Sequence, residues 1–227
     1  MPEILRFDKI EQVLLLTLIF FLPISVSVTN VIIVLILVSW LFSGNFKAKF
    51  AQIRNSKLVI ASIIFFLLHL IGLLWTEDIH WGGKIVKKML DFIVLLPILY
   101  TMVKKENIKH YISAFLLAIS FSELFSYLIW FEVIAPFGHA TVTNPTPFVF
   151  HIIYNPLLAF ATYLLAYEIR FNHELSKIRR SFFMFLFFTM SINMFITGGR
   201  SGQAMFFSGV VILLFQYFNK QYLKGKK

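Results

Sequence analysis

Long apolar stretches alternate with short polar segments along the whole chain. Eight of these stretches approach the length that a helix needs to cross a bilayer, about 20 residues for a hydrocarbon core of about 30 Å. They cover residues 11–27, 29–43, 58–75, 91–103, 111–132, 150–168, 181–197 and 203–218. The pattern predicts an all-α integral membrane protein, a polytopic bundle of about eight transmembrane helices.

The first two stretches are separated only by the segment LPISVSVTN. As one straight helix they would extend to roughly 50 Å at about 1.5 Å per residue, which exceeds the thickness of the hydrocarbon core. We therefore expect a helical hairpin. If that hairpin enters the membrane and returns to the same side without crossing it, the number of transmembrane helices falls to six. Every later loop then still lies on the same side of the membrane as in the eight-helix arrangement.

The composition is that of a membrane protein. Of the 227 residues, 59% are hydrophobic and 14% are charged, and the mean hydropathy is +0.80. So much apolar surface, which includes 28 Phe, is too large for one small water-soluble core. Because no repeat, low-complexity tract or linker interrupts the chain, we expect residues 1–227 to form a single polytopic membrane domain. Cysteine is absent, which excludes disulfides and thiolate chemistry.

The net charge of +10 is distributed unevenly between the two sides of the predicted bundle. Seventeen of the 21 Lys and Arg residues fall in the two tails and the loops on one side, and four fall on the other side: Lys84, Lys87, Lys88 and Arg200. By the positive-inside rule, both termini are cytoplasmic and these four residues face outward. The charge therefore indicates contact with anionic membrane lipids and not with nucleic acid.

The segment FITGGRSGQAMFF places Arg200 and Ser201 at an outward turn where the last apolar stretch begins. A guanidinium, a hydroxyl and the unpaired N–H groups of a helix start can together bind a phosphate. The alternative is that Arg200 extends to the membrane interface while Gly198 and Gly202 serve helix packing.

A second cationic segment, WGGKIVKKMLDF, places Lys84, Lys87 and Lys88 on one helix face beside the interfacial anchor Trp81. Such a helix can bind lipid phosphates or a lipid-linked diphosphate. The alternative is a solvated face on which Lys87 or Lys88 pairs with Asp91.

The remaining candidates for chemistry are isolated polar side chains. His139 lies in an outward loop, while His151 and Tyr154 share a helix face at the start of the sixth stretch. An imidazole there can act as a general base, or it can cap the helix. Glu123 is the carboxylate that lies well inside an apolar stretch. Both a functional role and a structural role remain open for it. The sequence lacks metal-ligand spacing and a nucleotide loop, so we expect neither metal nor cofactor.

The segments LLTLIFFLPISVSVTNVIIVLILVSWLFSGNFK, LLWTEDIHWGGKIVKKML, NPTPFVFHIIYNPLLAF and above all FITGGRSG cover most of the chain. Together they resemble the O-antigen ligase family, whose superfamily includes O-antigen polymerases and bacterial protein O-oligosaccharyltransferases. TGGRSG matches the family's Thr-x-x-Arg-Ser/Gly signature.

The resemblance implies a metal-independent, multi-pass glycosyltransferase of the bacterial inner (cytoplasmic) membrane. Such an enzyme moves a glycan from undecaprenyl diphosphate to a hydroxyl of a lipid A core sugar at the periplasmic face. Its partners are thus a lipid-linked oligosaccharide donor, the lipid A core acceptor and membrane lipids. By this resemblance the residues that bind the donor diphosphate are Arg200, Ser201, Lys84 and Lys88.

The chain also departs from the family. In full-length members a large periplasmic loop after the signature supplies a second arginine and the proposed catalytic histidine, whereas here 27 residues follow Arg200. We therefore expect the N-terminal part of a longer ligase-like fold, truncated or completed by a second chain. The catalytic base stays unassigned, with His139 and His151 as candidates, and activity of this chain alone stays open.

Two further functions remain open on the sequence. One is an O-antigen polymerase or a protein O-oligosaccharyltransferase. The other is a non-catalytic membrane protein, either a remnant or a transporter of lipid-linked sugars. A transporter is expected to carry polar residues through its spans and a repeated architecture, whereas this sequence offers Glu123 and His69 and no visible repeat.

Overall fold

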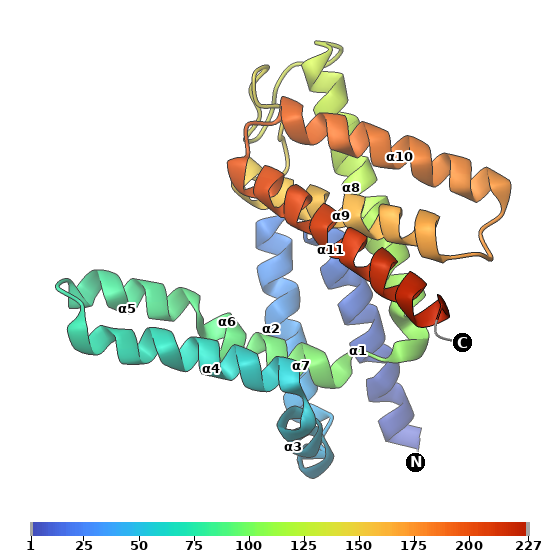
Figure 1. The fold of residues 1–227 in the computed structure, drawn as a ribbon. Helices are drawn as coiled ribbons and strands as arrows, with labels where there is room; N and C mark the ends of the chain where they lie inside the picture. Colours follow the sequence, from blue (N-terminus) through green and yellow to red (C-terminus); the bar gives the residue numbers. More distant parts are fainter. Residues whose placement is uncertain (1, 226–227) are drawn as a thin grey trace. The chain divides into compact units, whose positions relative to one another are not determined.

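The computed structural model describes residues 2–225, with side chains for residues 7–219. In this part of the chain every regular element is a helix. The one β-type pairing among the described residues is an isolated bridge between Thr141 and Asn144. The all-α prediction is confirmed. The elements (Figure 1) are α1 (Pro2–Phe21), α2 (Val26–Phe42), α3 (Phe46–Asn55), α4 (Lys57–Gly72), η1 (Leu73–Trp75), α5 (Ile79–Lys88), α6 (Leu90–Ile93), α7 (Leu95–Met102), η2 (Lys105–Asn107), α8 (Ile108–Trp130), α9 (His151–Phe171), α10 (Lys177–Ile196) and α11 (Arg200–Gly225).

The chain divides into two compact units. Unit 1 comprises Met1–Leu18 and Val28–Tyr111, and unit 2 comprises Ile19–Ser27 and Ile112–Lys227. Unit 1 therefore contains most of α1 and α2 and all of α3 to α7, while unit 2 contains most of α8 and all of α9 to α11. The single domain predicted for residues 1–227 stays a prediction.

In unit 1 the chain bends sharply after α2. Gly44 and Asn45 both adopt the left-handed backbone conformation, with φ of 65° and 55°, and α3 leaves α2 at 115°. Lys49 of α3 reaches back to the end of α2, where its Nζ donates to the Trp40 carbonyl oxygen at 2.9 Å and to the Ser43 hydroxyl at 2.6 Å. A cation at this helix end is stabilised by the unpaired carbonyl groups and the helix dipole.

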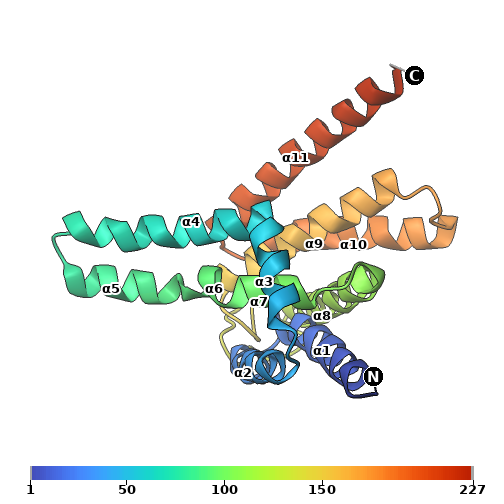
Figure 2. The same cartoon turned by 90° about the horizontal axis from the view of Figure 1, so that it is seen from below.

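The rest of unit 1 is a helical arm in which α4 runs beside α5, α6 and α7 (Figures 1 and 2). The Ser62 hydroxyl of α4 bonds to the Phe92 carbonyl oxygen of α6 at 2.9 Å, and the Trp40 indole N–H donates to the Thr101 hydroxyl of α7 at 2.9 Å. The predicted span 91–103 corresponds to the short apolar helix Leu90–Met102, which is distorted at Val94, between α6 and α7, where φ is −108° and ψ is −65°.

Unit 2 is built around α9, against which both α10 and α11 pack. Its core joins buried side chains from three helices, α8, α9 and α10. These include Ile119 of α8, Leu158 and Leu165 of α9, and Met190 and Met194 of α10. Because lipid tails are as apolar as these side chains, their burial stabilises the unit through van der Waals packing between the helices.

Four helices of the described part are long and apolar enough to cross a membrane, and α2 with α3 makes a fifth if the bent pair is one span. They are Lys57–Trp75, Lys105–Trp130, His151–Phe171 and Arg200–Asn219. The protein is therefore a polytopic helical membrane protein. The count of eight is not supported, because α2 has 17 residues, the apolar helix Leu90–Met102 is shorter than a span, and α10 begins with a cationic turn. The cytoplasmic location of both termini stays a prediction.

Candidate functional site

The segment between α8 and α9 is a folded loop of unit 2. Gly138 has φ of 60° and lies so close to the Pro147 carbonyl oxygen that a Cβ would overlap it. The His139 backbone N–H donates to the same oxygen at 3.2 Å. Phenylalanine rings from α8 and the loop pack together, namely Phe121, Phe125, Phe137 and Phe148. These contacts fix the loop at the N-terminus of α9.

This loop brings both candidate histidines to the start of α9. The exposed His139 ring stacks on Phe150 with 3.8 Å between the ring centroids, and Phe150 immediately precedes His151. The half-buried His151 ring is held by Asn144, whose side-chain nitrogen lies 2.8 Å from Nδ1. His151 therefore has what a general base requires, a second group that fixes the orientation of the ring.

The orientation of the Asn144 amide decides which nitrogen of His151 carries the proton. With the amide NH₂ toward Nδ1, as in the structure, the neutral ring carries its proton on Nε2. With the amide turned over, Nδ1 donates to the amide oxygen and Nε2 is free to accept a proton. The second orientation is the one in which His151 acts as a base through Nε2.

The TGGRSG turn is anchored on α9 by two buried side chains. The Asn155 amide donates to the Thr197 carbonyl oxygen at 3.1 Å and accepts from the Thr197 hydroxyl at 2.6 Å. A Cβ at Gly199 or at Gly202 would overlap Asn155, whereas a Cβ at Gly198 would meet open space. The glycines that allow close packing are therefore Gly199 and Gly202, whereas the alternative considered on the sequence paired Gly198 with Gly202.

Because of this close approach, two helix N-termini lie together in unit 2. α9 and α11 run parallel, since Gly202 meets Asn155 near their starts and the Arg170 guanidinium lies 4.3 Å over the Tyr217 ring near their ends (Figure 1). The positive ends of both helix dipoles therefore face the same side. An anion at this end interacts favourably with two helix starts at once.

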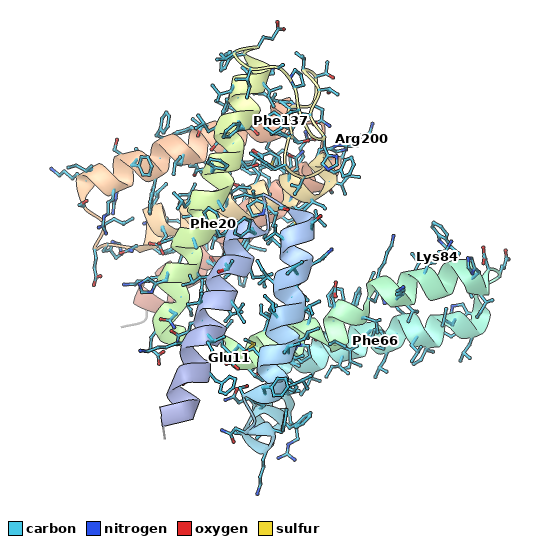
Figure 3. The ribbon with its side chains drawn as sticks, turned by 180° about the vertical axis from the view of Figure 1, so that it is seen from behind. Glu11, Phe20, Phe66, Lys84, Phe137 and Arg200 are labelled. Carbon is cyan, nitrogen blue, oxygen red and sulfur yellow. The ribbon has the colours of Figure 1, made fainter. Side chains whose placement is uncertain are left out.

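Arg200 and Ser201 are exposed at the start of α11. Within the described residues neither side chain has a hydrogen bond or an ion pair, and the first backbone bond of the helix runs from the Gln203 N–H to the Gly199 oxygen at 3.2 Å. The N–H groups of the first turn are thus unpaired. Figure 3 shows Arg200 at the end of unit 2 that also holds the loop with Phe137.

A buried polar network adjoins this end. The Asn193 amide of α10 accepts from the Tyr154 hydroxyl at 3.0 Å and donates to the Ser126 hydroxyl at 2.9 Å. Thr197 continues the network, because its hydroxyl lies 2.9 Å from the Asn193 carbonyl oxygen. Tyr154 therefore bonds within the bundle and joins α9 to α10. Glu123 is 4% exposed, and its Oε1 has no hydrogen-bond partner among the described residues.

Lys84 and Lys88 belong to unit 1, where α5 starts at an Asp78 cap whose carboxylate accepts from the Trp81 N–H at 2.9 Å. Lys84, Lys87 and Lys88 line a surface hollow of about 680 Å³ together with Trp81 and Asn30. In the described part of the chain neither Lys87 nor Lys88 pairs with Asp91, so the ion pair considered for this face is not formed.

Sequence reasoning missed the residues that hold the site, namely Asn144, Asn155, Asn193 and Thr197. The available signal was the presence of Asn and Thr within apolar stretches, since such side chains often form hydrogen bonds between membrane helices. Their partners are distant in sequence, because Asn155 bonds to Thr197, 42 positions away, and Asn193 bonds to Ser126, 67 positions away.

Among the described residues, no group of three or more His, Cys, Asp or Glu side chains is placed to hold a metal ion. No protein-family model, no curated protein and no solved structure matches the chain. Its function is therefore inferred from its own residues and geometry.

Proposed function

We propose that the chain is a glycosyltransferase of the O-antigen ligase type in the bacterial inner membrane. It binds an undecaprenyl diphosphate-linked glycan at the periplasmic face and transfers the glycan to a hydroxyl of the lipid A core. The observation that supports this most is the exposed, unpaired Arg200 guanidinium beside the N-termini of two parallel helices. That arrangement matches a diphosphate, which carries several negative charges on adjacent oxygens.

In the reaction the acceptor hydroxyl oxygen bonds to the anomeric carbon as the bond from that carbon to the diphosphate oxygen breaks. The diphosphate leaves with the electron pair, and a base removes the proton of the hydroxyl. Negative charge that develops on the leaving oxygen is stabilised by Arg200, Ser201 and the free N–H groups of α11. His151, held by Asn144, is the candidate base.

The orientation of the chain belongs to the same proposal. Both termini face the cytoplasm, and the turn with Arg200 faces the periplasm, as the distribution of Lys and Arg predicts. The lysines of α5 also face outward, where their hollow next to Trp81 attracts phosphates of the donor or of neighbouring lipids.

Binding of the donor lipid tests the proposal without requiring transfer. The purified chain in nanodiscs is titrated with undecaprenyl diphosphate, and uncharged undecaprenol serves as the ligand control. We expect Arg200→Ala to weaken diphosphate binding about tenfold to hundredfold, because hydrogen bonds to charged groups contribute about 1.5–3 kcal/mol. Binding of undecaprenol is expected to stay the same.

The matched control is Arg179→Ala, because Arg179 is also exposed in unit 2 and its side chain has no ion pair among the described residues. Equal loss of binding in both variants would show a general charge effect and would contradict a site at Arg200. O-antigen polymerases and protein O-oligosaccharyltransferases use the same type of donor, so they are separated from a ligase by the acceptor that becomes glycosylated.

A further inference from the structure

A groove of about 350 Å³ lies between α9 and α11 in unit 2. The two helices touch at their N-terminal ends and diverge toward their C-terminal ends, which Figure 2 shows from below. The lining is apolar over most of its length and includes Ala166, Phe187, Phe206, Leu213 and Leu214. Gly209 widens the groove, because its missing side chain leaves space next to Tyr163.

One cation lines this groove, and it lies at the wide end. The Arg170 guanidinium stacks on Tyr217 with 4.3 Å to the ring centroid, and Arg170 is exposed. Stacking uses the face of the guanidinium and leaves its edge N–H groups available for an anion. No carboxylate of the described residues forms an ion pair with Arg170. The groove thus combines an apolar trough with an unneutralised charge at one end.

The length of the groove fits one leaflet of a bilayer. It extends from Thr162 to Arg170 along α9 and from Phe206 to Tyr217 along α11. At about 1.5 Å per residue these distances are about 12 Å and about 17 Å, close to half of the hydrocarbon core of about 30 Å. Arg170 is then at the depth of the lipid headgroups, on the side opposite to Arg200.

We propose that this groove binds one acyl chain of an anionic phospholipid, whose phosphate pairs with the Arg170 guanidinium. A phospholipid carries its negative charge next to its acyl chains, which is the arrangement that the groove and Arg170 complement. An isoprenoid chain from a diphosphate at Arg200 would bring no charge to Arg170. This lipid site does not depend on the proposed transferase activity.

Native mass spectrometry of the purified chain tests the site. Retention of phosphatidylglycerol and of phosphatidylcholine with the same acyl chains is compared for the unchanged chain, Arg170→Gln and Arg179→Gln. We expect the unchanged chain to prefer phosphatidylglycerol, and Arg170→Gln to lower that preference about fivefold, since one cation near a membrane surface contributes about 1 kcal/mol. Arg179→Gln is the matched control, because Arg179 does not line the groove.

A second variant, Gly209→Leu, tests the acyl-chain part of the proposal. The Cβ at this position meets Tyr163 at ordinary contact distances, 3.5 Å and longer, so a larger side chain extends into the groove. We expect it to reduce retention of both phospholipids, while Gly209→Ala, which keeps most of the space, retains them. The proposal is overturned if Arg170→Gln and Arg179→Gln have equal effects, or if undecaprenol displaces the phospholipid from the unchanged chain.

Discussion

At the scale of single residues, Gly202 sets how closely α11 approaches α9. A Cβ at this position would lie 2.6 Å from the backbone carbonyl carbon of Asn155 and 2.7 Å from its oxygen. These are backbone atoms of a helix, so they cannot move aside as the end of a flexible side chain does. The contact also determines where Arg200 lies, since Arg200 is two positions before Gly202.

We therefore expect Gly202→Ala to destabilise unit 2 by about 1–3 kcal/mol, the usual cost of overpacking a well-packed contact. The measurement is the free energy of unfolding in a detergent titration. Gly198→Ala is the matched control, because nothing lies within 4 Å of a Cβ there, and we expect its stability to be unchanged or slightly higher. Equal destabilisation by both variants would contradict the close approach at Gly202.

The sequence predicts only those residues of the candidate site whose chemical character is evident from their immediate neighbours in the chain. Arg200 and Ser201 stand out because a cation and a hydroxyl follow two glycines in an apolar region. Asn155 and Thr197 do not stand out, since each is one polar residue in an apolar stretch, and their hydrogen bond forms only in the folded chain. The role of Asn144 depends equally on its contact with His151, seven positions later.

At the scale of elements, most helices follow from the apolar pattern, and the exceptions have local causes. The polar segment after α2 forms the helix α3, because Phe46 and Lys49 both contact the end of α2 through Trp40. The apolar stretch at 91–103 has the composition of a span, yet its helix, Leu90–Met102, is short and is distorted at Val94, between α6 and α7. Periodicity alone does not detect either feature, since one depends on a contact between helices and the other on a local distortion of the helix.

The cationic helix α5 depends on its N-cap, which leads to a prediction at this scale. The Asp78 carboxylate accepts from the Trp81 N–H, and loss of such a cap costs about 1 kcal/mol. We expect Asp78→Ala to speed amide hydrogen exchange in residues 79–88 about fivefold, because a helix without its cap opens more often. Asp78→Asn keeps the acceptor oxygen and is expected to exchange at the original rate. Equal exchange in all three proteins would show that the cap does not stabilise α5.

At the scale of the whole molecule, the distribution of charge and the length of the helices together predict how the chain is oriented in the membrane. α9 has 21 residues, which is about 32 Å of helix and enough to cross the hydrocarbon core. The loops at its two ends therefore lie on opposite sides of the membrane if α9 spans it. Lys177, Arg179 and Arg180 follow its C-terminal end, whereas residues 131–150 before its N-terminal end contain no Lys or Arg.

The positive-inside rule then assigns the loop after α9 to the cytoplasm, and labelling of single cysteines measures this directly. The chain contains no cysteine, so the unchanged protein is a background-free control. Val142→Cys and Glu174→Cys place one exposed thiol in each loop of unit 2. With a membrane-impermeant maleimide on intact spheroplasts, we expect labelling of Val142→Cys and protection of Glu174→Cys until the membrane is opened. The reverse pattern would place Arg200 on the cytoplasmic side, where it could not meet a periplasmic donor, and the proposed transferase would be untenable even if the lipid groove at Arg170 remained.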